Sequence, residues 1–316
     1  MRYASFLFAR VRLEGSVPSA FMSALTFATA QILRVLPRAH MSRAAGRLAD
    51  FSWPAPLGRA VIGLYSRAYD VSVEECEQRD GWASFDDFFT RSLRPGARPI
   101  EPDPRVIVSP ADGRLESMGM IDSGRTFTVK GRPYRVRELV GDDKEAARYE
   151  GGGGCVVYLS PRDYHRVHAP VSGLIHHVRS MPGDFFPVNS IGVRHVPNLF
   201  AVNRRIAIAI DTPPETALGR VTVVMVAAMI VGRITVSGIP SRDVPVGDHQ
   251  IDPPLYVERG SEIGMFHLGS TIVLFLEKKA MERWVADEGP VLYGQKLARA
   301  PQLRRTNGTA SRGDTG

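Results

Sequence analysis

Short runs of β-branched and aromatic residues dominate the chain from about residue 106 onward. Glycine, proline and aspartate separate these runs, as they separate the strands of β-rich proteins. The runs are VIV (106–108), TFTV (126–129), CVVYLS (155–160), IAIAI (206–210), VTVVMVAAMIVGRITV (221–236) and TIVLFL (271–276). This pattern predicts a core of antiparallel or mixed sheets, with one helical insertion within residues 136–149.

Residues 1–93 have the spacing of helices instead. In the segment 57–70, apolar residues recur at intervals of three and four and would share one helix face. These residues are Leu57, Val61, Leu64, Tyr65 and Ala68. Ser72 with Glu75, and Ser84 with Asp87, have the spacing of capping boxes that open short helices. The segment 91–105, rich in proline and arginine, predicts an extended connector. The predicted fold class is therefore α+β, a β-rich core preceded by helices.

The first fifty residues carry a basic, apolar pattern that suits a membrane surface. Residues 15–33 have no charge, but serine, threonine and proline dilute them, so a transmembrane span is a weaker hypothesis. An apolar stripe recurs at helical spacing through Phe21, Leu25, Ala28, Ile32 and Leu36. Seven arginines precede residue 50 against a single acidic residue. An amphipathic helix lying on an anionic leaflet is favoured, with a span or an ordinary core helix left open.

Composition and charge narrow the class of protein further. With 316 residues and 44% hydrophobic residues, the chain can bury a sizeable core. The two cysteines form no CxxC pair, which fits a reducing compartment. The net charge of +7 is concentrated at the N-terminus, and no aromatic interleaving suggests a nucleic-acid binder. We expect membrane-associating helices in 1–50, a main domain in 51–298 and a disordered tail in 299–316.

Three positions could carry acid–base chemistry. Asp112 stands in the turn-like segment SPADG, where an ordinary Asp-Gly turn is the alternative. His165 and His168 lie three residues apart after a predicted strand, and histidine is well suited to proton transfer near neutral pH. One of them could equally pack in the core while the other is solvated. No third ligand stands at a recognisable spacing, so we expect no metal.

Two aromatic loops could line an apolar pocket. They are MPGDFFPVN (181–189) and VPNLFAVNRR (196–205), which join aromatic side chains to polar ones. The candidate substrate-binding residues are Phe185, Phe186, Asn189, Asn198 and Phe200. The alternative is that these aromatic rings belong to the core beneath a loop.

Gly269, Ser270 and Thr271 interrupt a strand-like pattern late in the chain, in MFHLGSTIVLFLE (265–277). A plain hairpin would favour Asn-Gly or Asp-Gly there. Ser270, His168 and Asp112 together supply the residue types of a nucleophilic triad. However, the serine is not in a G-x-S-x-G elbow, so a general serine hydrolase fits poorly.

An ordered set of motifs resembles the phosphatidylserine decarboxylase family. The motifs are FDDFFTRSLRPGARPI, SPADG, YLSPRDYHRVHAP, PGDFFPVN, PNLFAVNRR, VGRI and EIGMFHLGST, and they span roughly residues 55–300. The resemblance implies a proenzyme in which Ser270 attacks the carbonyl of Gly269 and the chain is cut there. It implies that His168 is the base, that Asp112 orients the imidazole, and that Ser270 becomes a pyruvoyl group. His165 would then return a proton during decarboxylation.

The resemblance also implies partners and a location. The two products, 1–269 and 270–316, would stay together as a heterodimer, and a higher homo-oligomer is left open. The substrate would be phosphatidylserine at the cytoplasmic face of the cell membrane, where the enzyme is peripheral, and the product phosphatidylethanolamine. The pyruvoyl ketone would be the electron sink that decarboxylation needs and that no side chain offers. The competing hypotheses are a serine hydrolase that is not cut and a non-catalytic membrane-surface β-domain.

Overall fold

A computed structural model describes residues 37–77, 81–216, 218–229, 233–269 and 271–302. The amphipathic stripe predicted between residues 21 and 36 lies outside these residues, as does the predicted tail beyond residue 302. The ordered core extends into the segment predicted as tail, because Ala300 is buried and its N–H donates to Arg105.

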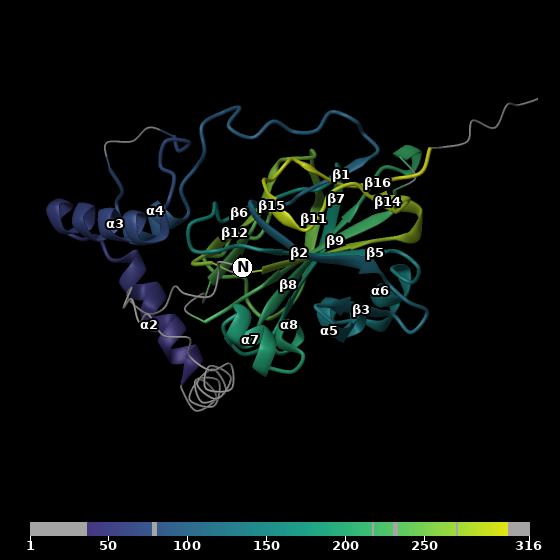
Figure 1. The fold of residues 1–316 in the computed structure, drawn as a ribbon, viewed down its shortest axis with the longest axis horizontal. Helices are drawn as coiled ribbons and strands as arrows, with labels where there is room; N and C mark the ends of the chain where they lie inside the picture. Colours follow the sequence, from purple (N-terminus) through teal and green to yellow (C-terminus); the bar gives the residue numbers. More distant parts are fainter. Residues whose placement is uncertain (1–36, 78–80, 217, 230–232, 270, 303–316) are drawn as a thin grey trace, which may run out of the picture.

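Three of the described α-helices precede the first strand, and the other four lie between later strands. The first three, α2 to α4, lie at one end of the molecule (Figure 1). The helices are α2 (Arg38–Asp50), α3 (Ala55–Tyr69), α4 (Phe85–Phe89), α5 (Val136–Val140), α6 (Asp143–Arg148), α7 (Ser190–His195) and α8 (Leu199–Val202). The helical insertion predicted within 136–149 is confirmed as the pair α5 and α6. Single-turn 3₁₀ helices occupy Pro214–Thr216 and Lys278–Ala280.

One of the two predicted capping boxes forms. The hydroxyl of Ser84 accepts a hydrogen bond from the N–H of Asp87 and caps α4. Residues 72–75 do not open a helix, so that prediction was wrong. Glu75 is instead ion-paired with Arg98 from the connector, at 2.7 Å. A tertiary contact thus takes the side chain that a capping box would need.

The strands form antiparallel sheets, which confirms the predicted β-rich core. Their bounds are β1 (Val106–Val108), β2 (Gly113–Met120), β3 (Thr126–Val129), β4 (Arg132–Arg135), β5 (Gly153–Tyr158), β6 (Arg166–His168), β7 (Gly173–Met181), β8 (Arg205–Asp211), β9 (Arg220–Val226), β10 (Arg233–Val236), β11 (Gly247–Val257), β12 (Glu262–His267), β13 (Thr271–Leu276), β14 (Arg283–Trp284), β15 (Gly289–Val291) and β16 (Lys296–Arg299). The large sheet has the order β11-β7-β8-β9-β13-β5-β2-β15 among the described strands, and smaller sheets join β1-β16-β14, β10-β12-β6 and β3-β4. The run 221–236, predicted as continuous, is split between β9 and β10.

Strand β13 lies inside the large sheet, and all six of its residues are buried. It pairs with β5 on one side and with β9 on the other. Aromatic rings of Phe127 and Tyr149 pack against Phe275 at centroid distances of 6.0 and 5.6 Å. The small sheet β10-β12-β6 packs close to β9. A Cβ placed on Gly264 of β12 would lie 3.1 Å from the sulfur of Met225 in β9. The continuous apolar run of β13 therefore reflects burial on both faces.

Candidate functional site

The loop before β6 and the end of β12 meet at His165 and Gly269. Strands β6 and β12 pair antiparallel, and the N–H of Phe266 donates to the carbonyl of His165 at 3.0 Å. A Cβ placed on Gly269 would lie 2.8 Å from Nε2 of His165. Residues more than a hundred positions apart in the sequence are therefore in direct contact, and only a residue without a side chain fits against the ring.

His165 is sealed in an apolar setting. It is fully buried, and its ring lies 4.0 Å, centroid to centroid, from the ring of Phe89 in α4. Neither ring nitrogen has a hydrogen-bond partner among the described residues. Burial, reinforced by the nearby charge of Arg91, lowers the pKa of His165 to about 3. The imidazole is therefore neutral at pH 7, with unused polar atoms at the end of β12.

His168 has the tautomer that a general base requires. Its Nδ1 lies 2.7 Å from the carbonyl oxygen of Gly260, and because a carbonyl only accepts, Nδ1 must carry the proton. Its Nε2 lies 3.2 Å from the hydroxyl of Tyr164, which then donates to the lone pair. The ring stacks on Tyr293 at 3.8 Å, nearly parallel. Burial lowers the pKa of His168 to about 4, so Nε2 is unprotonated at neutral pH.

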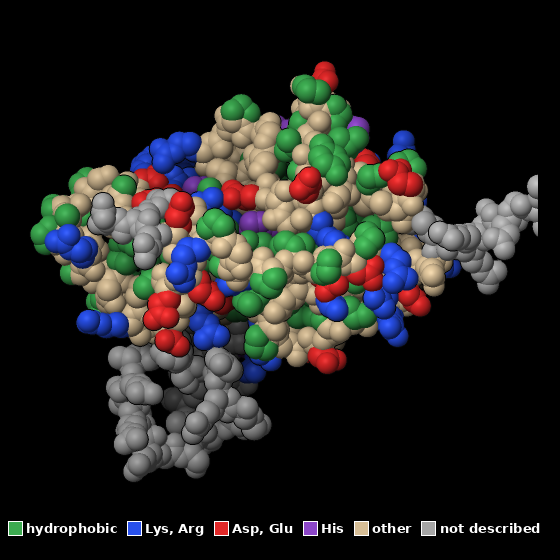
Figure 2. All heavy atoms as spheres, turned by 90° about the horizontal axis from the view of Figure 1, so that it is seen from above, with side chains coloured by type: hydrophobic (Ala, Val, Ile, Leu, Met, Phe, Trp, Pro, Cys, Tyr) green, Lys and Arg blue, Asp and Glu red, His purple; other side chains and the backbone are tan. Residues whose placement is uncertain are grey.

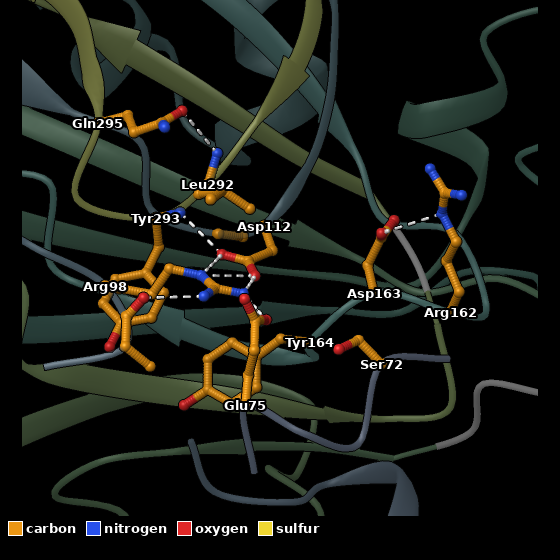
Figure 3. Close-up of polar contacts among 12 residues, drawn as sticks. Ser72, Glu75, Arg98, Asp112, Arg162, Asp163, Tyr164, Leu292, Tyr293 and Gln295 are labelled. Carbon is orange, nitrogen blue, oxygen red and sulfur yellow. Dashed lines mark hydrogen bonds and ion pairs between the residues drawn. The ribbon is translucent and has the colours of Figure 1, made fainter. Parts of the chain in front are cut away.

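Asp112 is held by a buried cation and a backbone amide. Nε and Nη2 of Arg98 lie 3.0 and 2.7 Å from the carboxylate, and the N–H of Tyr293 donates to it at 2.8 Å (Figure 3). Arg98 also reaches Glu75. Burial raises the pKa of Asp112, although the hydrogen bonds from Arg98 lower it. Asp112 immediately precedes β2, in the segment that follows β1, and is 4% exposed.

The hydrogen bond expected between Asp112 and His168 is replaced in the structure by contacts of both residues with a shared neighbour, Tyr293. The hydrogen bonds of the His168 ring go to Gly260 and Tyr164, so a backbone carbonyl sets its tautomer. Asp112 contacts Tyr293, whose backbone binds the carboxylate and whose ring stacks on His168. The two predicted residues thus share one neighbour rather than a direct hydrogen bond. Neither Gly260 nor Tyr293 has a sequence motif that would have identified it.

Ser270 lies outside the described residues, while its neighbours are described. Thr271 begins β13, paired with Tyr158 of β5 and Val226 of β9. On the other side, Leu268 has a φ of 82°, a left-handed conformation that non-glycine residues rarely adopt. In the sequence, the Gly269–Ser270 bond therefore follows a residue with a strained backbone and precedes a strand fixed in the sheet.

The five residues predicted to bind substrate have structural partners of their own. Phe186 exchanges backbone hydrogen bonds with the side chain of Asn203 and lies beneath Arg38, whose Cζ is 3.9 Å from the ring centroid. Phe185 is half-buried against the core. Phe200 stacks on Tyr134 in the core, Asn189 caps α7, and Asn198 precedes α8 in a left-handed conformation. The core interpretation fits Phe200 best, and the substrate role of the set stays a prediction.

Known proteins with similar sequences share one description. A family model described as phosphatidylserine decarboxylase matches residues 85–299. Proteins named phosphatidylserine decarboxylase proenzyme are 40% identical over 251 residues in Anaeromyxobacter sp. (strain K), covering 78% of this chain and 88% of that protein. The corresponding protein of Myxococcus xanthus is 37% identical over 279 residues, covering 84% and 96%. That of Bordetella pertussis is 39% identical over 276 residues, covering 83% and 91%.

Proposed function

This chain belongs to the phosphatidylserine decarboxylase family, and we propose that it is a proenzyme that cuts itself between Gly269 and Ser270 before it acts. The mature form then converts phosphatidylserine to phosphatidylethanolamine and CO2. The contact between Gly269 and His165 carries the proposal, because it places the histidine expected to protonate the substrate beside the bond whose cleavage would create the pyruvoyl group.

The self-cleavage requires a base, an electrophile and a leaving group. Once the hydroxyl of Tyr164 releases it, Nε2 of His168 takes the proton of the Ser270 hydroxyl, and Oγ attacks the carbonyl carbon of Gly269. The peptide C–N bond breaks and an ester forms, with the proton passing to the freed amine. Removal of the Cα proton of residue 270 then expels the carboxylate of Gly269 and leaves a dehydroalanine. Water converts the dehydroalanine to a ketone with release of ammonia, which gives the pyruvoyl terminus.

The residues beside Gly269 fit a pyruvoyl group. Both ring nitrogens of His165 are buried without partners among the described residues, and Nε2 lies 2.8 Å from the position that a Cβ on Gly269 would take. A pyruvoyl ketone, once formed, supplies the electron sink for loss of CO2. A substrate carboxylate beside His165 favours the protonated imidazole, since an opposite charge raises the pKa of a histidine. When CO2 leaves as a neutral molecule, the electron pair of the broken bond stays on the substrate Cα, and the proton of His165 passes to that carbon.

An amphiphilic substrate requires that the enzyme reach a leaflet, and α3 supports such a contact. Helix α3 has no buried residue, and Leu57, Val61 and Leu64 expose 45%, 37% and 71% of their surface. Hydrophobic and basic side chains appear together at the end of the molecule formed by α3 (Figure 2). Among the described residues, no helix has the length and apolar character needed to cross a bilayer. We place the enzyme peripherally at the cytoplasmic face of an anionic cell membrane.

The decisive experiment combines a denaturing gel with intact mass measurement of the purified protein. We expect two chains, 1–269 and 270–316, and a short chain whose mass shows a terminus without an α-amine. Purified protein should release CO2 from vesicles containing phosphatidylserine, and Ser270→Ala should remain a single inactive chain. A single intact wild-type chain with full decarboxylase activity would overturn the proposal. An uncut chain with esterase activity instead would favour the serine hydrolase.

A further inference from the structure

A second cluster of charged side chains adjoins the proposed cleavage bond. We call Asp50, Asp86, Arg233 and His267 the anchor cluster. Nδ1 of His267 lies 2.8 and 3.0 Å from the two carboxylate oxygens of Asp86, and because a carboxylate only accepts, Nδ1 donates. Arg233 lies 3.1 Å from Asp86 and hydrogen-bonds Asp50 at 2.6 Å. The mechanism proposed above uses none of these four residues.

The cluster is mostly removed from solvent, so its contacts matter more than those of a surface ion pair. Asp86 is 8% exposed. Burial alone would raise the pKa of Asp86, but the hydrogen bond from His267 and the charge of Arg233 lower it. Nε2 of His267 is buried without a hydrogen-bond partner among the described residues, so the ring is held through Nδ1. Removing one partner from such a buried set of charges lowers stability far more than removing one partner of an exposed ion pair.

The position of His267 connects the cluster to the cleavage segment. His267 is the last residue of β12 and pairs with Arg233 of β10 across the small sheet. The next residue is Leu268, with its left-handed φ of 82° and a buried side chain. Gly269 follows, packed against His165. The strained residue therefore lies between two fixed points, the Asp86–His267 hydrogen bond and the contact with His165.

We propose that His267 is a positioning residue for self-cleavage, which holds the strained Leu268–Gly269 segment in place through Asp86. The inference rests on the proposed self-cleavage and deepens it. Strained backbone persists only where the surrounding structure fixes it. Asp86 belongs to α4 and Asp50 ends α2, so the cluster also joins the N-terminal helices to the cleavage segment. The N-terminal helices thereby contribute to processing as well as to membrane contact.

The test measures the rate of chain cleavage after cell-free synthesis, followed on a denaturing gel. His267→Leu and Asp86→Ala should each slow cleavage by roughly ten- to a hundredfold, the effect expected for losing a hydrogen bond to a charged group. The double variant should be no slower than the slower single variant, since both remove the same contact. His177→Leu is the control for losing an exposed pair of the same residue types, because His177 lies 3.4 Å from Asp248 between β7 and β11 and should leave the cleavage rate unchanged.

Further readouts separate positioning from a general loss of structure. Molecules of His267→Leu that have been cut should decarboxylate at the wild-type rate per short chain, because the Gly269–Ser270 bond that His267 helps to position has by then been broken. His267→Asn keeps an amide donor near the position of Nδ1 and should process within about threefold of wild type, whereas His267→Gln should be slow. If His267→Leu does not fold, this Asn–Gln comparison decides.

Wild-type cleavage rates in both His267→Leu and Asp86→Ala, or equal rates in the Asn and Gln variants, would overturn the inference. Those results would leave the proposed function intact so long as the wild-type protein is cut at Gly269. Failure of the wild-type protein to be cut would instead overturn the proposed function.

Discussion

Replacing Gly269 by alanine should slow self-cleavage by crowding His165. The added methyl group would lie 2.8 Å from Nε2 of His165, well inside the distance at which heavy atoms attract. The ring cannot retreat easily, because it is fully buried and lies against Phe89. Gly269 does not have a left-handed φ, so alanine suits its backbone and the effect is steric.

The magnitude follows from the cost of overpacking. One extra methyl group in a tightly packed site costs about 1–3 kcal/mol. If that cost falls on the arrangement that cleaves the chain, the rate drops roughly 5- to 160-fold, because about 1.4 kcal/mol corresponds to a factor of ten. Time points of cell-free synthesis, resolved on a denaturing gel, measure this rate. Gly119→Ala is the control, because a methyl group there meets no atom within 4 Å.

A second substitution tests the cause. Gly269→Ala combined with His165→Ala removes the obstructing ring, so cleavage should return toward the rate of His165→Ala alone. Cleavage of Gly269→Ala at the wild-type rate would show that the methyl group does not crowd His165. A double variant as slow as Gly269→Ala, with His165→Ala alone cut faster, would show that the crowding involves another group.

Buried charges, neutral histidines and one helix cap make three other perturbations informative. Arg98→Met removes the cation beside the Asp112 carboxylate, which is only 4% exposed, and should lower the free energy of unfolding by roughly 3–5 kcal/mol. The urea midpoint should fall accordingly, and an unchanged midpoint would contradict this expectation. Because the folded-state pKa values of His165 and His168 are about 3 and 4, the unfolded state binds more protons below pH 6.5, and stability should fall as pH drops from about 6.5 toward 4. Their joint contribution approaches about 2.7 kcal/mol per pH unit, and urea titrations should show that slope diminish when both are changed to glutamine. Ser84→Ala should cost about 1 kcal/mol, detected as a lower melting temperature, and no change would mean that the cap is redundant.

Local signals predicted the fold where no distant contact competed with them. Ser84 caps α4 as its spacing indicates, whereas Glu75 is drawn into an ion pair with Arg98 of the connector. The long apolar run after residue 221 hides a break, because Ala227 leaves the strand to hydrogen-bond the carbonyl of Arg204. Hydrophobic pattern alone cannot reveal such a break, since both sides of it are buried.

The chemistry of the site was predictable in its residue types but not in its connections. His165 and His168 can be identified from the sequence, because histidine is the side chain that ordinarily exchanges protons near neutral pH and two of them stand in one short motif. The carbonyl of Gly260 does not, because every residue has a carbonyl. Tyr293 joins the site from 181 residues beyond Asp112, and only the folded sheets bring them together.

The central place of β13 governs what happens to the protein once the chain is cut. The short product would supply β13 to the middle of the large sheet and β15 and β16 to other pairings, so it could leave only if the whole core opened. While the peptide bond exists, the tether keeps β13 near its neighbours at an effective concentration of order millimolar. After cleavage that advantage is gone, and refolding becomes a bimolecular reaction. Uncut Ser270→Ala should therefore recover after dilution from urea, whereas the mature protein should be long-lived when folded yet unable to reassemble from dilute solution.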